Sequence, residues 1–243
     1  MSKISPKTSF NYSPNFYNKK RKPQNIKFII LHYTGMKNDK QSIQRLTDSN
    51  SSVSCHYYID ANGKILSIVP DLYIAWHAGK SKWKNHKLLN KSSIGIEISN
   101  PGHNLGYKNF TNKQLSSVKK LISFLIKEYK INSNNVLGHS DIAPFRKKDP
   151  GEKFPWRNLA KKKLCLWHSL NEKQIKKFRN KKTDNLRQKI FFSNLTKIGY
   201  NVSNSKKEKN LIINAFQRRF RQELISNKVD EECYLISKNL VST

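Results

Sequence analysis

The segment from residue 136 to residue 156, VLGHSDIAPFRKKDPGEKFPW, constrains this chain more than any other stretch. A short apolar run ends at His139, a loop broken by prolines follows, and Asp149 stands ten residues further on. A histidine and an aspartate joined by a stiff loop can converge on one metal ion. Lys147 is not expected to be a ligand, but it is well placed to meet negative charge near such an ion.

A catalytic zinc site needs about three protein ligands and an open position for water. His32 is a third candidate, because it follows another strand-like run at residues 26–31. Two histidines and one carboxylate suit a catalytic zinc with one open position. Spacing alone is weak evidence, since most histidines are structural, and His56 and His77 compete as ligands. What favours His32 and His139 is that both end strand-like runs, where functional loop residues commonly lie.

Glu97 is the second feature that points to catalysis. It lies in the isoleucine-rich run 94–98, where a carboxylate is costly unless it faces a pocket or water. One interpretation is a glutamate on an edge strand facing solvent, and the other is a positioned general base. Lys147 is likewise either one more surface lysine or a group that stabilises a developing oxyanion.

The two remaining histidine candidates differ in context. His56 lies in an alternating strand, which favours a core histidine with satisfied hydrogen bonds. His77 follows Trp76 and precedes a glycine, so we expect it on a cleft wall. Trp76 would offer an apolar face on which a sugar can stack.

The remaining pattern predicts a mixed α/β domain in which helices pack on a central β-sheet. The turn at 60–63, Asp-Ala-Asn-Gly, predicts a hairpin. A helix is expected at 39–48, and a second from the capping box of Thr111 and Gln114 to about residue 130. Strands are expected at residues 27–32, 53–59, 65–69, 94–98 and 136–139.

By composition the chain divides into four parts. Residues 1–25 form a polar, proline-containing arm, and residues 26–158 form the α/β domain, with a polar loop at 80–91. Residues 159–182 are lysine-rich and are predicted to be a linker. Residues 183–243 are predicted to form a small all-α domain of three helices.

Five motifs in this order resemble the zinc-dependent N-acetylmuramoyl-L-alanine amidases of the AmpD/AmiD type, which are related in fold to peptidoglycan recognition proteins and phage amidase lysozymes. They are LHYT (31–34), VSCHYYIDANGKI (53–65), AWHAG (75–79), SIGIEISN (93–100) and GHSDIAPFRKKDPG (138–151). The resemblance covers roughly residues 10–158.

The resemblance implies one zinc ion held by His32, His139 and Asp149, with Glu97 and Lys147 as the catalytic pair. It implies cleavage of the amide between the lactyl group of N-acetylmuramic acid and L-alanine, in peptidoglycan or in muropeptides, including anhydro-muropeptides. We expect the substrate to contact Tyr33, Trp76 and His77. The alternative is a recognition protein that holds muropeptide without cutting it, a state usually marked by a lost zinc ligand.

Residues 183–243 resemble the small peptidoglycan-binding domain of AmiD-like enzymes. The similarity lies in Leu195, Gly199-Tyr200, the segment INAFQRRF (213–220) and Asp230. The glycine usual before the last aspartate segment is absent, because this chain has Asn227, Lys228 and Val229 there.

Charge restricts the partners further. The chain carries 47 Lys and Arg residues against 16 Asp and Glu, a formal net charge of +31. Such a field favours polyanionic partners, although a lysine-rich proteome would produce the same balance. The lysines are scattered in small clusters, which argues against a nucleic-acid groove, so we expect no specific nucleic-acid partner. A polyanion-binding protein nevertheless remains an alternative.

Three cysteines without a CxxC pair, Cys55, Cys165 and Cys233, fit a reducing compartment. The first 17 residues lack the apolar core of a signal peptide, and no stretch is long enough for a transmembrane segment. We therefore expect a cytoplasmic monomer, or a periplasmic or wall-associated one if a non-standard route exports it. AmpD-like members act in the cytoplasm, whereas AmiD-like members are typically exported and membrane-anchored.

Overall fold

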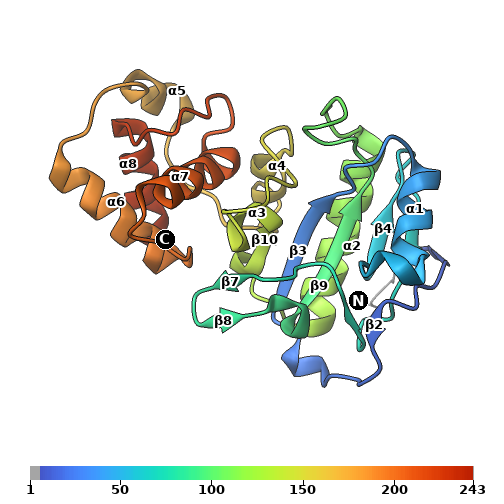
Figure 1. Ribbon diagram of the computed structural model, residues 1–243. Helices are drawn as coiled ribbons and strands as arrows, with labels where there is room; N and C mark the ends of the chain where they lie inside the picture. The colour runs from blue at the N-terminus through green and yellow to red at the C-terminus, as the bar shows by residue number, and fades with distance from the viewer. Residues whose placement is uncertain (1–5, 243) are drawn as a thin grey trace.

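A six-stranded β-sheet forms the centre of the protein in the computed structural model, which describes residues 6–242 (Figure 1). Residues 1–5 of the expected arm, and Thr243, lie outside the described part. The strand order is β1-β5-β4-β9-β3-β10, and neighbours are parallel except in the hairpin β4–β5. The strands are β1 (Thr8–Phe10), β3 (Phe28–Tyr33), β4 (Tyr57–Ile59), β5 (Ile65–Ser67), β9 (Ser93–Ile98) and β10 (Val136–Gly138). The expected mixed α/β fold and its hairpin are confirmed.

The centre of the sheet is the parallel pair β3 and β9, with sequences FIILHY and SIGIEI. Strands of this kind are buried on both faces and therefore read as almost continuous apolar runs. Their register places His32 opposite Glu97, near the carboxyl ends of both strands. β10 pairs with the other side of β3 and aligns Gly138 with Leu31, so His139 follows next to His32.

Two helices cover the sheet as the sequence predicts. Helix α2 (Asn112–Tyr129) begins at the capping box of Thr111 and Gln114 and buries its apolar side in the same cluster as Ile29 and Ile96. Helix α1 (Asp39–Thr47) begins at Asn38, whose side chain accepts from the Gln41 amide, and buries Leu46.

Three segments differ from the expected pattern. The strand expected at 53–59 is limited to 57–59, because residues 53–56 turn into the core irregularly. The expected polar loop 80–91 holds a small hairpin, β7 (Lys82–Trp83) and β8 (His86–Lys87). The last strand ends at Gly138, and His139 opens a short helix, α3 (His139–Ile142).

The described part of the N-terminal arm joins the sheet edge. β1 extends the six-stranded sheet beside β5, and β2 (Phe16–Tyr17) pairs with β6 (Ile74–Ala75). The Arg21 side chain is buried and donates to the carbonyl oxygens of Asp71, Asn90 and Ser93. This segment therefore packs as part of the domain.

Residues 159–182 also pack rather than hang free. After helix α4 (Trp156–Ala160), Leu164 and Cys165 lie buried in the core cluster of the sheet and α2. Helix α5 (Glu172–Ile175) follows, and Ile175 is buried in the second large cluster. The division of the chain at residues 158 and 182 stays a prediction.

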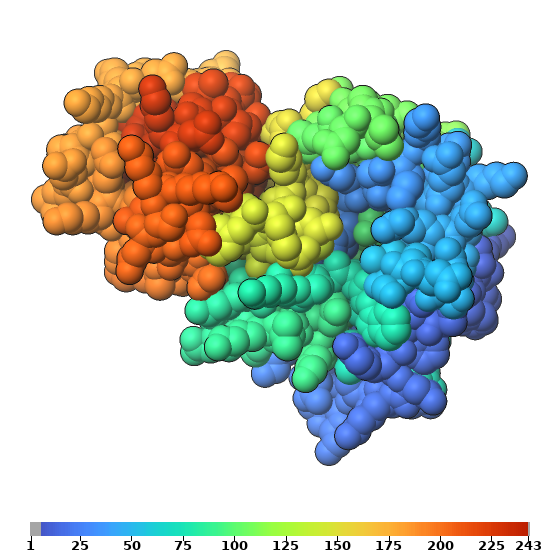
Figure 2. Space-filling model, in the orientation of Figure 1, coloured from blue at the N-terminus to red at the C-terminus, as the bar shows by residue number. Residues whose placement is uncertain are grey.

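The C-terminal unit, residues 183–242, holds the three expected helices. They are α6 (Asn185–Ile198), α7 (Lys206–Phe220) and α8 (Glu231–Ser242). Gly199 ends α6 with a φ of 140°, and a Cβ there would meet the Trp83 ring. Figure 2 shows this unit, in orange and red, against the yellow-green and teal segments of the other domain. Both share one hydrophobic cluster, which includes Ile30 and Phe216.

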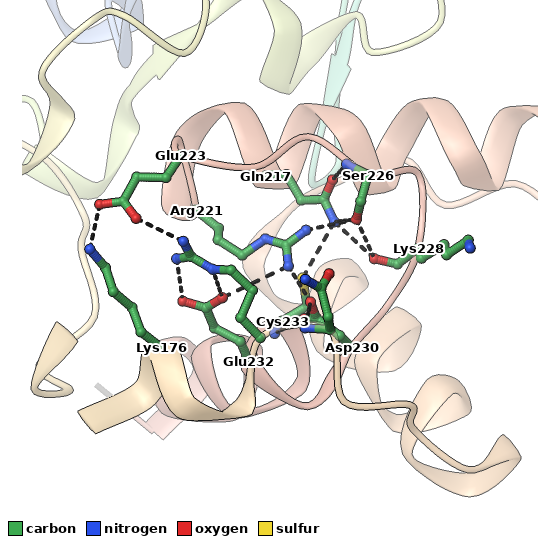
Figure 3. Close-up of polar contacts among 11 residues, drawn as sticks. Lys176, Gln217, Arg221, Glu223, Ser226, Lys228, Asp230, Glu232 and Cys233 are labelled. Atoms are coloured by element: carbon green, nitrogen blue, oxygen red, sulfur yellow. Dashed lines mark hydrogen bonds and ion pairs between the residues drawn. The ribbon is translucent and has the colours of Figure 1, made fainter. Parts of the chain in front are cut away.

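Buried charge pairs hold the loop after α7 (Figure 3). Arg221 pairs with Asp230, and its Nη2 donates to Ser226 Oγ at 2.9 Å. Glu232 accepts two hydrogen bonds from the guanidinium of Arg179, at 2.6 and 2.7 Å. Asn227 has a left-handed φ of 57°, which asparagine tolerates better than most residues, in the segment that lacks the usual glycine.

Candidate functional site

A cleft of about 460 Å³ opens at the carboxyl ends of β3 and β9. Its walls come from α1, the segment around Trp76 and the loops at 103–104 and 146–149. Figure 2 shows this hollow between the light-blue segment and the yellow-green one. Ligand sites in α/β sheets commonly lie at the carboxyl ends of parallel strands.

Three predicted ligands converge at the floor of the cleft. His32 Nδ1 lies 2.9 Å from His139 Nδ1, and each of these nitrogens lies 3.0 Å from Asp149 Oδ2. All three residues are buried. Among the described residues, these three side chains form a group whose ligand atoms lie close enough together to hold one metal ion.

The opposite edges of the two imidazole rings are held by other groups. His139 Nε2 lies 3.2 Å from the Ala78 carbonyl oxygen and 3.3 Å from Arg146 Nη2. His32 Nε2 lies 3.1 Å from His77 Nδ1. In protein zinc sites, outer partners of this kind orient the ligand rings and select their tautomers.

The pKa values of the ligand side chains also favour metal binding. Burial and the neighbouring His139 lower the pKa of His32 to about 4, so this ring is neutral at pH 7. Burial alone would raise the pKa of Asp149, but His139 and His32 hold it well below its ordinary value. A neutral imidazole and an ionised carboxylate are the forms that bind a metal ion.

Glu97 points into this cleft from the middle of the sheet. β9 lies between β4 and β3, so the alternative of an edge-strand glutamate facing water is wrong. Burial raises the pKa of Glu97 well above its ordinary value, Asp149 raises it further, and Lys147 lowers it. Its Oε2 is buried and has no hydrogen-bond partner among the described residues.

These observations fit a zinc ion. Two nitrogens and one carboxylate oxygen form a donor set typical of catalytic zinc, and all ligand atoms lie within 4.8 Å of one another. The Oε2 atom of Glu97, which has no partner among the described residues, leaves a polar group available to a water molecule or a substrate.

The loop that carries Asp149 also contributes two basic residues. Lys147 is half-buried and lines the cleft. Arg146 donates to the carbonyl oxygens of Ala78, at 2.5 Å, and Lys80, at 2.9 Å. Arg146 thereby ties this loop to the segment behind His139. Nothing in the run Arg-Lys-Lys distinguishes that arginine from its neighbours in the sequence.

The other predicted site residues lie nearby with different surroundings. Tyr33 and Trp76 line the cleft. His77 also borders the cleft, but its Nε2 lies 3.2 Å from Ser93 Oγ and its Nδ1 faces His32. His56 is the satisfied core histidine that its context favours, since its Nδ1 accepts from the Gly95 amide at 2.9 Å.

A polar chain behind Tyr33 was not foreseen from the sequence. The Tyr33 hydroxyl lies 2.9 Å from His103 Nδ1, and His103 Nε2 lies 3.1 Å from Glu152 Oε2. Glu152 in turn lies 3.8 Å from the Arg218 side chain on α7. These residues come from four separate segments with no shared motif, so no sequence signal identifies them.

Comparison with known proteins gives a consistent result. A family model described as N-acetylmuramoyl-L-alanine amidase matches residues 22–152. The amidase AmiD of Escherichia coli (strain K12) is 34% identical over 230 residues, which cover 89% of this chain and 82% of AmiD. The 1,6-anhydro-N-acetylmuramyl-L-alanine amidase AmpD of Haemophilus influenzae is 31% identical over 162 residues, covering 59% of this chain and 85% of AmpD.

Solved structures extend the likeness over both units. AmiD from E. coli, in complex with the substrate anhydro-N-acetylmuramic acid-L-Ala-D-gamma-Glu-L-Lys, superposes with a TM-score of 0.79 at 33% identity, covering 90% of this chain and 89% of that one. AmpDh3 from Pseudomonas aeruginosa, in complex with anhydromuramic pentapeptide, gives 0.79 at 26% identity, covering 93% of each chain. None of the helices at residues 6–242 has the length and apolar character that crossing a membrane requires.

Proposed function

The chain belongs to the N-acetylmuramoyl-L-alanine amidase family, and from this premise we propose how its cleft carries the reaction. Enzymes of this class hydrolyse the amide between the lactyl group of N-acetylmuramic acid and L-alanine. We propose a zinc-dependent reaction on muropeptides, with His32, His139 and Asp149 as ligands. The convergence of these three side chains in the cleft that Glu97 also lines, with its Oε2 unpartnered among the described residues, carries the proposal.

A zinc ion held by these residues would lower the pKa of water and polarise the scissile carbonyl. The protein supplies the remaining chemistry. Glu97 takes a proton from the attacking water and returns one to the leaving amine of L-alanine. Lys147, on the loop that carries Asp149, offers its ammonium group to the oxygen that gains negative charge in the tetrahedral transition state.

The substrate is proposed from chemistry and from the relatives. AmiD and AmpDh3 are known in complexes with anhydromuramic peptides. Such ligands carry carboxylates, and the cleft of this chain is bordered by Arg45, Arg146 and Lys148. Tyr33 and Trp76 line the same cleft and are proposed to contact the sugar or the stem peptide.

His77 has a more specific role in this proposal. Both of its ring nitrogens have partners, His32 on one side and Ser93 on the other. This arrangement supports a role in orienting His32. Direct contact between His77 and the substrate stays a prediction. The recognition-protein alternative expects a lost ligand, and this chain retains all three ligands together with Glu97.

Three expectations about the whole protein stay predictions. They are binding of the wall by the C-terminal unit, a monomeric state and a cytoplasmic location. Pull-down with insoluble peptidoglycan, light scattering and cell fractionation measure them in turn.

Digestion of defined muropeptides, followed by mass spectrometry, tests the proposed reaction. We expect free stem peptide to be released, to disappear with a chelator and to return when zinc is added. Parallel digestion of 1,6-anhydro and reducing-end substrates shows which class the cleft prefers. Release that persists after complete removal of metal would contradict the zinc-dependent mechanism.

A further inference from the structure

Asp141 is a buried carboxylate close in the chain to the proposed metal ligand His139. It lies in α3, two residues after His139, and only 1% of its surface is exposed. Its Oδ2 accepts a hydrogen bond from the Gly138 amide at 2.8 Å. This bond closes the first turn of α3, whose first residue is His139. The reaction proposed above gives Asp141 no part.

The other partners of Asp141 come from the C-terminal unit. Arg219 of α7 places Nη1 2.5 Å from Asp141 Oδ2, although 78 residues separate the two. The Tyr200 hydroxyl, just after α6, donates to Asp141 Oδ1 at 2.7 Å. Both carboxylate oxygens are therefore satisfied from outside the domain that holds the cleft.

Arg219 forms hydrogen bonds on both sides of the turn that carries His139. Its Nη2 donates to the Val136 carbonyl oxygen at 3.1 Å, at the start of β10. Its guanidinium carbon lies 4.3 Å from the centre of the Trp156 ring, which packs against the turn. Only 2% of Arg219 is exposed. One side chain of α7 thus holds the strand before His139 and the helix after it.

We propose that Arg219 and Tyr200 are positioning residues for the metal site and act through Asp141 on the turn that presents His139 Nδ1. The C-terminal unit would then be part of the catalytic apparatus, besides any role in binding the wall. This inference rests on the proposed function, because it assumes that His139 is a metal ligand.

The physical reason is the cost of an unpaired buried charge. Without Arg219, the Asp141 carboxylate would remain buried with no opposing charge, which strongly favours its movement out of this position. Such a movement disturbs its bond to the Gly138 amide and with it the first turn of α3. Groups that hydrogen-bond a metal ligand directly typically change metal affinity 10- to 100-fold. Arg219 acts further from the metal, through Asp141 and the turn, so we expect a smaller effect.

The test uses the full chain and three substitutions. Arg219→Met removes the charge and keeps most of the length, whereas Tyr200→Phe removes a single hydroxyl. Arg221→Met is the matched control, because Arg221 is also a buried arginine near the end of α7. Its side chain pairs with Asp230 and Ser226 within the C-terminal unit (Figure 3).

Two measurements other than activity report on the site. Zinc affinity is measured by competition with a chromophoric chelator, and ligand geometry by the visible absorption of the cobalt-substituted protein. We expect Arg219→Met to weaken zinc binding up to about tenfold and Tyr200→Phe to weaken it less, both with an altered cobalt spectrum. Arg221→Met should leave both measurements unchanged. Arg219→Lys should recover part of the affinity, because it restores the charge.

The outcomes separate this inference from the proposed function. Wild-type protein that binds no zinc would overturn the metal site and the positioning role together. Zinc affinity and cobalt spectra that match the wild type in both Arg219→Met and Tyr200→Phe would overturn only the positioning role. If Arg219→Met does not fold, Tyr200→Phe decides the question, since it removes one hydrogen bond and retains the ring.

Discussion

His77 stands directly behind His32: its Nδ1 lies 3.1 Å from His32 Nε2, on the ring edge opposite the nitrogen that faces Asp149. His77 Nε2 is 3.2 Å from Ser93 Oγ, and that hydroxyl donates to the Leu89 carbonyl oxygen at 2.6 Å. A line of polar groups therefore runs from the backbone to the proposed metal ligand. It sets both the tautomer and the orientation of His32.

Gly95 leaves the room that this arrangement needs. A Cβ at position 95 would lie 2.4 Å from His77 Cγ, so Gly95→Ala should displace the His77 ring. We expect zinc affinity to fall about tenfold or more, because His32 loses its support. Competition with a chelator measures the change.

A double variant separates the two effects of this clash. Gly95→Ala combined with His77→Ser removes the steric conflict and should restore thermal stability without restoring zinc affinity. Recovery of both would show that His77 does not support His32.

Glu97→Gln tests the general base with little change in shape. We expect turnover to fall by about 10²- to 10⁴-fold, since an amide cannot accept the proton from water. Zinc content should stay at one equivalent, because Glu97 is not among the three ligands. Single-turnover kinetics together with metal analysis checks both points. Turnover near that of the wild type would remove Glu97 from the proposed role.

Lys147→Ala tests the stabilisation of the oxyanion. We expect kcat to fall about 10²- to 10³-fold with a smaller change in KM, because the ammonium group acts mainly on charge that develops in the transition state. Lys162→Ala is the matched control, since Lys162 is exposed and lies outside the cleft. Steady-state kinetics on one muropeptide compares the two. Equal kcat values in the two variants would show that Lys147 contributes only to the overall positive charge of the protein and not to stabilisation of the oxyanion.

The framework of the site was predictable because it is local in sequence. Apolar runs that end in His32 and His139 become parallel neighbours, and the pairing of β10 with β3 brings the two rings together. Asp149 follows on a short loop, and Glu97 interrupts an apolar run that is otherwise buried. Period and composition mark these runs in the sequence, and the resemblance of the five motifs supplies the ligand set that the strand pairing brings together.

What could not be predicted depends on contacts between distant segments. Three of the seven residues at 215–221 are arginines, and no periodicity shows that Arg219 is the one that reaches Asp141. The start of α3 at His139 depends on Asp141, whose charge is balanced 78 residues away. The N-terminal arm gave no strand pattern, because β1 and β2 have only three and two residues.

His168 should make stability depend on pH outside the cleft. Burial and the nearby Arg157 lower its pKa to about 4, whereas an unfolded histidine titrates near 6.5. Unfolding therefore takes up a proton below pH 6.5, so this contribution is complete above that pH and is lost as the pH falls towards 4. We expect the wild type to lose about 2 kcal/mol from this group between pH 7.5 and pH 5.

Urea unfolding of the wild type and of His168→Gln at both pH values measures this contribution. Other buried histidines add the same loss to both proteins, so the difference between the two curves isolates His168. The gap in unfolding free energy should shift by about 2 kcal/mol in favour of the variant at pH 5. A gap that does not change with pH would show that His168 titrates alike in both states.

The buried position of Asp141 also bears on how such a chain changes over generations. Losing the C-terminal unit would strip Asp141 of Arg219 and Tyr200, and replacing Asp141 first would leave Arg219 buried without an opposing charge. Either step alone weakens the protein, and a joint exchange of Asp141 and Arg219 for apolar residues still removes the acceptor of the Gly138 amide. The Asp141 carboxylate therefore couples the stability of the cleft domain to the C-terminal helices, independently of any role of those helices in binding the wall.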